Sequence, residues 1–407
     1  MPFHSSSAQN YRSWMRERFP MFNQSIDDDR FENLSTLSHE SIEASDAIVH
    51  DERADRRECF TYISMIHTAL FHHKKRATEL GILLPDNFAT TLQKVESDML
   101  RLASSIGVQH RFLSVFYLFY NPEIPDLQGK FAQFRPSDYE TAFLRINHEG
   151  TLQYKLAANA LYDAFDQLHG GAASFESIRS LLESAATAFH KISLGNAMLL
   201  KTAGSEEFRF LTQYFGEVQV AGKSLRGVNA GDQPWSYIID LVLGVDLKRV
   251  FERAFEGTPS ERNYLAHAKT SADVIDHEFR SGEYLHSTYL LPEDYEYLRT
   301  IIQKIEVHPE PLTSILSSSF LGDEELEIAA VLHQVIRHYL TASNVHFQLA
   351  KRHVPHNANG EQIGSAGTNI LRFLKEGLND EREKIKNQLE SKYPKLLKIN
   401  TIKAAVI

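Results

Sequence analysis

The stretch that most constrains this chain is a long amphipathic segment near its C-terminus, from about Asp323 to Val354. Its inward-facing residues recur at three- and four-residue steps, which places them on one face of a helix; they are Leu332, Val335, Ile336, Tyr339, Ser343, His346 and Ala350. Asp323 is a suitable N-cap, and Pro355 cannot continue a helix. The pattern therefore predicts one long helix with a buried face.

His346 lies in the middle of that face. A buried imidazole needs a partner for each ring nitrogen, which can be a backbone carbonyl or a metal ion. His353 falls on nearly the same face one heptad later, and His333 points roughly the other way. Most histidines on apolar helix faces are simply hydrogen-bonded. Periodicity alone therefore does not select a metal ligand among them.

Charge and cysteine content exclude several classes of protein. The 407 residues carry a formal net charge of -10 without a basic block, which argues against nucleic acid or an anionic membrane surface as partner. Cys59 is the single cysteine, so neither a disulfide framework nor a cysteine-rich metal site is expected. No apolar run has the length of a membrane span or a signal-peptide core. We expect a cytoplasmic protein that does not bind membranes.

Helical periodicity dominates the rest of the chain. The first fifty residues are polar, and we expect them to be loosely structured or wrapped on the surface. Helices are predicted over 52–76, after Pro85, from a cap at Ser137 or Asp138 with Gly150 as a candidate break, from Ser174, and over 234–255, 292–307 and 368–389. A short strand is the alternative at 218–220. The predicted fold class is mostly α, a helical bundle.

A segment rich in proline and glycine, residues 121–130, reads as a connection. It predicts a smaller N-terminal helical part, residues 1–125, with a polar leading segment. The remaining residues, 126–407, would then form a larger helical domain.

Two glycine-containing stretches could approach a ligand. In Gly364 to Thr368, backbone N–H groups ahead of a helix could hold a carboxylate, although Thr368 could equally be only an N-cap. Leu225 to Gln233 could approach a flat ligand closely or could be a surface loop ending at the N-cap Asp232. The chain shows no Ser-His-Asp order, phosphate loop or paired-carboxylate motif above chance.

Taken in this order, these pieces resemble the heme-dependent indoleamine/tryptophan 2,3-dioxygenase superfamily, closest to its monodechloroaminopyrrolnitrin synthase-like branch. The resemblance covers residues 135–390. Four segments carry it: Phe189-His190-Lys191-Ile192, Leu225 to Gln233 with Ile239 to Gly244, Val345-His346-Phe347-Gln348-Leu349, and Gly364 to Lys375. The larger predicted domain would accordingly be the heme-binding one.

The resemblance implies a site built around heme b. His346 matches the proximal ligand, whose Nε2 would bind the iron, and its mid-face position favours it over His353. The residues implied to contact the cofactor are His346, Ala230, Gly231, Ser343, Gly364 and Thr368. Those implied to contact the substrate are Phe143, Ile146, Asn147, Phe208, Thr212, Asn229, Ala230, Gly367 and Thr368.

The chain departs from the dioxygenases at two positions. Thr212 stands where they carry the arginine that binds the amino-acid carboxylate, and Ser343 replaces a basic residue three before the proximal histidine. Arg209 and Arg226 are candidates to substitute for that arginine. We therefore expect a modified indole or another aromatic substrate rather than ordinary tryptophan ring cleavage.

The expected activity is that of a heme-dependent oxygenase, acting with O2 or peroxide on a small aromatic substrate. No protein acid or base is expected to be essential, and His148 is either a distal hydrogen-bonding group or a surface or capping histidine. The alternatives are hydroxylation of another aromatic amino acid and a helical binding protein of the same fold that has lost the heme. We expect a monomer or a homodimer.

Overall fold

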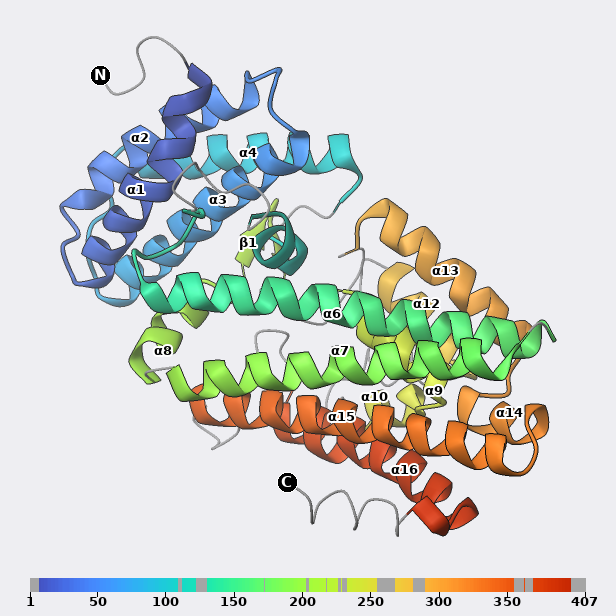
Figure 1. Cartoon of the computed structure of the whole chain (residues 1–407). Helices are drawn as coiled ribbons and strands as arrows, with labels where there is room; N and C mark the ends of the chain where they lie inside the picture. Colours follow the sequence, from blue (N-terminus) through green and yellow to red (C-terminus); the bar gives the residue numbers. More distant parts are fainter. Residues whose placement is uncertain are drawn as a thin grey trace. The chain divides into compact units, whose positions relative to one another are not determined.

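A computed structural model describes most of the chain. The residues that it leaves undescribed are 1–6, 109–111, 122–129, 172, 203–204, 217, 226–227, 229–232, 255–267, 281–289, 355–361, 363–368 and 397–407. The described residues are mostly helical, which confirms the predicted fold class (Figure 1). No helix among them is long and apolar enough to cross a membrane.

The chain divides into two compact units. Unit 1 comprises residues 1–148, 202–233 and 288–292, and unit 2 comprises residues 149–201, 234–287 and 293–407. Helix α6 (Asp138–His169) begins in unit 1 and ends in unit 2. The division at residue 125 expected from sequence is a different partition and stays a prediction.

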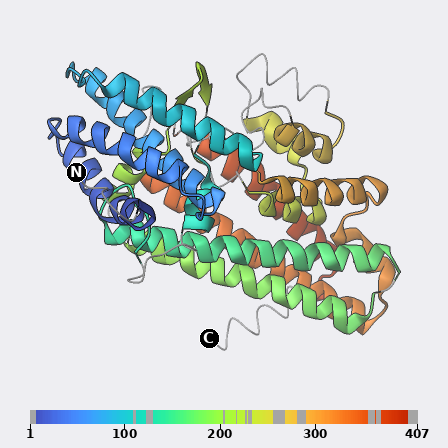
Figure 2. The same ribbon diagram turned by 90° about the horizontal axis from the view of Figure 1, so that it is seen from above.

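Four helices form the first part of unit 1: α1 (Ser7–Asp27), α2 (Asn33–Val49), α3 (Arg56–Glu79) and α4 (Phe88–Ile106). They lie side by side in both views of the chain (Figures 1 and 2). The expectation of a loosely structured first fifty residues is wrong, because α1 and α2 lie in this stretch. A few large apolar side chains, among them Phe19, Leu34 and Leu37, are fully buried in a stretch that is polar on average. The buried Glu40 is also paired, accepting from Trp14 Nε1 at 2.6 Å.

The remaining elements of unit 1 include a π-helix η1 (Val115–Tyr120), the start of α6, α8 (Ser205–Gln213) and a hairpin. The hairpin joins β1 (Val218–Val220) to β2 (Lys223–Leu225), with Val218 opposite Leu225. Its turn residues Ala221 and Gly222 have φ of 50° and 74°, as a type I′ turn requires. The predicted strand at 218–220 is therefore confirmed.

Unit 2 contains all or most of each of the three longest helices in the described part of the chain. They are α6, which continues from unit 1, together with α7 (Phe175–Thr202) and α15 (Asp323–His353). The shorter helices of this unit are α9 (Trp235–Leu243), α10 (Leu247–Ala254), α12 (Ser271–Arg280), α13 (Pro292–Val307), α14 (Leu312–Ser319), the π-helix η2 (Leu371–Asn379) and α16 (Asp380–Lys392). Within this unit, α7 contacts α15 through the rings of Phe189 and Tyr339, stacked with centroids 4.5 Å apart.

Three of the predicted helices differ from the structure. Gly150 does not break α6, because one glycine in a long helix costs only about 1 kcal/mol. The helix expected over 234–255 is two helices, since Gly244 adopts a left-handed φ of 85° and ends α9. The helix expected over 368–389 begins as η2 at Leu371 and continues as α16.

Candidate functional site

His346 lies in the C-terminal third of α15, and its side chain is half-buried. Burial lowers the pKa of His346 below its usual value, so the ring is neutral at physiological pH. Within the described part of the chain, its ring nitrogens have no hydrogen-bond partner. A neutral imidazole with an available lone pair is the form that binds a metal ion. The side chain thus fits the iron ligand that the resemblance implies.

The other two histidines of α15 have different surroundings. His333 is buried, and its Nε2 lies 2.7 Å from Oε1 of Glu390 on α16. This pairing shows why a buried histidine need not be a ligand. His353 is also buried, at the last residue of the helix, where burial lowers its pKa.

A buried polar network fixes α15 one turn before His346. Ser343 Oγ donates to Asn379 Oδ1 at 2.6 Å and accepts from Arg382 Nη1 at 2.9 Å. Asn379 Nδ2 in turn donates to Asn344 Oδ1 at 3.0 Å. Through these bonds, the end of η2 and the start of α16 hold the backbone that carries His346.

Ser343 therefore has a structural role that competes with the cofactor contact predicted for it. Both described partners of its hydroxyl are protein groups, and the residue is buried. A second group in this network is Asp240 on α9, which pairs with Arg382. The serine contributes to positioning the helix, and its contact with a cofactor stays a prediction.

Two of the predicted substrate residues meet in an aromatic cluster of unit 1. Phe143 on α6 and Phe208 on α8 have ring centroids 6.2 Å apart at 70°. Tyr139 contacts Phe208 edge-on at 6.2 Å, and Phe215 lies 6.3 Å from Phe143. The structure therefore brings together, in one apolar surface, two side chains that the sequence placed 65 residues apart.

Two of the remaining described candidates, Asn147 and Thr212, donate side-chain hydrogen bonds to carbonyls of their own helices. Asn147 Nδ2 donates to the carbonyl of Phe143 at 2.8 Å. Thr212 Oγ1 donates to the carbonyl of Arg209 at 3.0 Å. Ile146 is half-buried on the same helix as Phe143. These contacts neither establish nor exclude the predicted substrate roles.

Several predicted site residues lie outside the described part of the chain. They are Asn229, Ala230, Gly231, Gly364, Gly367 and Thr368, together with the candidate substitute Arg226. The described candidates divide between the units: His346 and Ser343 belong to unit 2, and Phe143, Ile146, Asn147, Phe208 and Thr212 belong to unit 1.

The sequence did not predict two groups of ionisable side chains that lie in the interior of the units. One is the Arg382–Asp240 pair of unit 2. The other is a cluster of Asp27, His72 and His73 in unit 1, whose ligand atoms all lie within 4.8 Å of one another. The sequence features that could have indicated these groups are an aspartate within the apolar run Ile238 to Leu243 and two consecutive histidines.

Comparison with known proteins supports the predicted resemblance. Residues 86–249 match the family model described as monodechloroaminopyrrolnitrin synthase PrnB. The match confirms the resemblance expected from the sequence for this part of the chain. It includes Phe143 and Phe208 and ends before α15. No curated protein matches the chain at a significant level.

Proposed function

We propose that this protein is a heme-dependent oxygenase that acts on an aromatic, tryptophan-derived substrate. The match to the monodechloroaminopyrrolnitrin synthase family supports the class of enzyme. The observation that carries the assignment to particular residues is His346, a half-buried, neutral imidazole without a hydrogen-bond partner in the described structure. The proposed cofactor is heme b, and the proposed co-substrate is O2 or a peroxide.

His346 would bind the iron through Nε2, and heme would supply the redox chemistry that activates the oxidant. The protein's part is to hold that imidazole in one place. Ser343, Asn379 and Arg382 do so by fixing the preceding turn of α15. A ligand whose helix is anchored by buried hydrogen bonds keeps its orientation when the cofactor binds.

The substrate would be oriented by apolar contact rather than by acid–base groups. Phe143 and Phe208 offer ring faces and edges against which an indole can pack. Asn147 and Thr212 supply nearby polar groups on the same two helices, α6 and α8. We propose that none of these residues transfers a proton in an essential step.

Heme occupancy tests the ligand assignment without any knowledge of the substrate. We expect the purified, heme-loaded protein to show a Soret absorption band and His346→Ala to lose it, because the iron then has no axial imidazole. His353→Ala is the matched control, since it removes another α15 histidine and should retain heme. Equal heme content in His346→Ala and the parent would refute the assignment. A parent protein unable to bind heme would instead favour a helical binding protein of this fold.

A further inference from the structure

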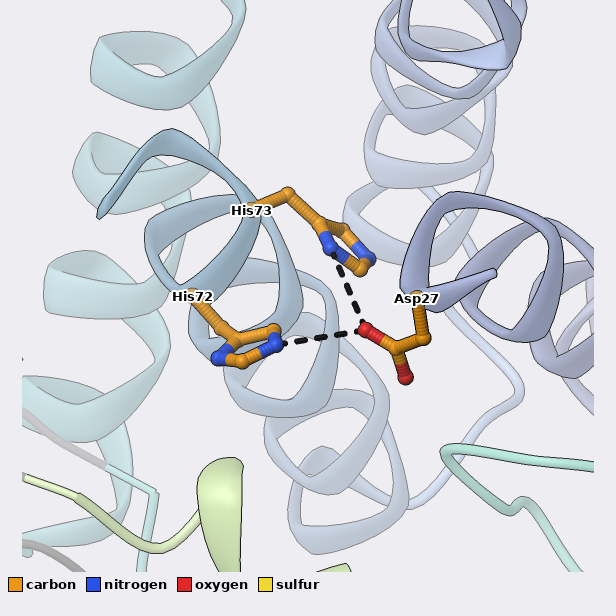
Figure 3. A group of neighbouring side chains, drawn as sticks. All are labelled: Asp27, His72 and His73. Carbon is orange, nitrogen blue, oxygen red and sulfur yellow. Dashed lines mark hydrogen bonds and ion pairs between the residues drawn. The ribbon is translucent and has the colours of Figure 1, made fainter. Parts of the chain in front are cut away.

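Three ligand-type side chains converge at the end of α1 (Figure 3). Asp27 is the last residue of α1, and His72 and His73 are consecutive residues of α3. His72 Nε2 lies 3.3 Å from Asp27 Oδ1, and His73 Nδ1 lies 3.9 Å from the same oxygen. The side chains of consecutive helix residues normally point in different directions. Both rings approach Asp27 here because His72 presents Nε2, the ring nitrogen farther from its backbone, and His73 presents Nδ1, the nearer one.

The hydrogen bond on the far side of His73 determines what it presents to Asp27. His73 Nε2 lies 2.9 Å from Asn23 Oδ1, and the tautomer that donates to this oxygen carries its proton on Nε2. Nδ1 then directs a lone pair toward Asp27 while being buried and without a hydrogen-bond partner in the described structure. Burial lowers the pKa of His73 to about 3, so the ring remains neutral.

A lone pair and a carboxylate oxygen that face each other in a buried place repel unless something positive lies between them. A ligating histidine typically shows this arrangement, with its other nitrogen donating to an amide or carboxylate oxygen. Asn23 occupies that supporting position for His73. The hydroxyl of Tyr214 supports the other ligand, donating to Asp27 Oδ2 at 2.9 Å.

The net charge of the groups around the cluster favours the binding of a cation. Arg76 and Arg135 approach the Asp27 carboxylate at 3.4 and 3.9 Å. Each guanidinium also contacts a second carboxylate, Asp29 at 2.7 Å for Arg76 and Asp28 at 3.5 Å for Arg135. Three carboxylates thus face two guanidiniums, which leaves one net negative charge before the histidines are counted.

We propose that Asp27, His72 and His73 bind a divalent transition-metal ion of the zinc type, which ties the end of α1 to α3. Two imidazole nitrogens and one carboxylate oxygen are a donor set that Zn²⁺ accepts. Bonds of about 2.0–2.2 Å require ligand atoms roughly 3.3 Å apart in a tetrahedron. The 3.3 Å separation already meets this, and the 3.9 Å separation needs a shift of about half an ångström. The two ligating nitrogen atoms, which lie within 4.8 Å of each other, must approach to the same spacing.

The fourth position would be open to water on the side of His72. Its side chain is 12 % exposed, whereas those of Asp27 and His73 are inaccessible. All three ligands lie in unit 1, and His346 belongs to unit 2. The proposed metal site therefore shares no residue with the proposed heme ligand and does not depend on the proposed oxygenase activity.

Zinc titration of the full-length, heme-free, chelator-treated protein tests the site. We expect calorimetry and elemental analysis to give one zinc ion per chain, and thermal unfolding to move to higher temperature with Zn²⁺ but not with Mg²⁺, which prefers oxygen ligands. His72→Gln should weaken binding at least about 100-fold, and Asn23→Ala, which removes only the support of His73, about 10–100-fold.

His169→Gln is the matched control. His169 and His308 form a partly exposed ring pair with centroids 4.7 Å apart in unit 2, the arrangement that would bind zinc adventitiously. Its loss should leave the affinity unchanged. The proposal is overturned if the parent binds no zinc, if His72→Gln binds as tightly as the parent, or if His169→Gln removes the bound ion. Since His72 is partly exposed, its variant should fold even if variants of the buried His73 do not.

Discussion

Arg382 and Asp240 form a two-point ion pair in the interior of unit 2. Arg382 Nε donates to Oδ1 at 2.9 Å and Nη2 donates to Oδ2 at 2.6 Å. The two residues are 4 % and 1 % exposed. Arg382 also donates to the hydroxyl of Tyr339 and to Ser343, so one guanidinium joins α16 to α9 and α15.

Replacing one member of this pair should destabilise the protein strongly. In Arg382→Met the carboxylate of Asp240 stays buried without its cation, which typically costs about 3–5 kcal/mol. The double variant Arg382→Met with Asp240→Leu should recover much of that loss, because no uncompensated charge remains. Denaturant unfolding measures both free energies.

An exposed pair provides the control for that comparison. Arg299→Met breaks the surface contact of Arg299 with Glu296, at 3.4 Å, and should change the free energy of unfolding by less than about 1 kcal/mol. If Arg382→Met were no more destabilised than Arg299→Met, the buried pair would not be the anchor described above.

Gly244 should not tolerate a side chain. It has a φ of 85°, and a Cβ there would lie 2.7 Å from Cβ of Pro311. Gly244→Ala combines the left-handed backbone cost of about 1–2 kcal/mol with an overpacking cost of about 1–3 kcal/mol. Gly81, which follows the end of α3, has a φ of 67° with nothing within 4 Å, so Gly81→Ala should show the backbone cost alone. Thermal unfolding of the two variants compares them, and equal losses would show that the contact with Pro311 is unimportant.

Sequence periodicity predicted α15 well because the signal extends over thirty residues and Pro355 ends it. It failed for α1 and α2, where a few buried apolar residues lie among many polar ones and Glu40 is buried with partners. A local average of polarity cannot detect such a face, whereas tertiary pairing makes it stable.

The candidate sites show a similar division. His346 could be proposed from the sequence because it lies on a long periodic face and in a segment that resembles the dioxygenases. The partner of Asp240 could not, because it lies 142 residues away. The convergence of His72 and His73 depends on which ring nitrogen each one presents to Asp27. Such geometry has no sequence period.

Glu140 should make stability fall as the pH rises. It is buried and accepts from Tyr117 Oη and from the backbone N–H groups of Phe134 and Arg135, yet burial raises its pKa to about 7. An unfolded glutamate titrates near pH 4.3, so the native state binds more protons between about pH 4 and pH 7. The free energy of unfolding therefore decreases through this window, by up to roughly 3 kcal/mol, and levels off above it.

Glu140→Gln removes the titrating group and should flatten this part of the profile. Denaturant unfolding at pH 5 and pH 8 gives the change for each protein, which separates the Glu140 contribution from that of other carboxylates. Glu306→Gln alters an exposed glutamate and should behave as the parent does. A Glu140→Gln profile parallel to that of the parent would mean that Glu140 is ionised throughout the range.

Free L-tryptophan should be a poor substrate for ring cleavage, if the proposed oxygenase activity is correct. By the resemblance predicted from the sequence, Thr212 stands where the dioxygenases carry the arginine that binds the amino-acid carboxylate, and its hydroxyl donates to the carbonyl of Arg209. A threonine cannot replace the charged two-point contact of an arginine. Losing a charged hydrogen bond costs roughly 1.5–3 kcal/mol, which is about one to two decades in affinity.

N-formylkynurenine formation from L-tryptophan by the heme-loaded, reduced protein under air provides the measurement. An indole derivative without the carboxylate is the matched substrate. We expect its turnover to equal or exceed that of L-tryptophan, because its binding does not need the missing arginine. Turnover of L-tryptophan on the order of 1 s⁻¹ or faster would contradict this prediction. It would indicate that Arg209 or Arg226 binds the carboxylate, which Arg209→Ala and Arg226→Ala would then distinguish.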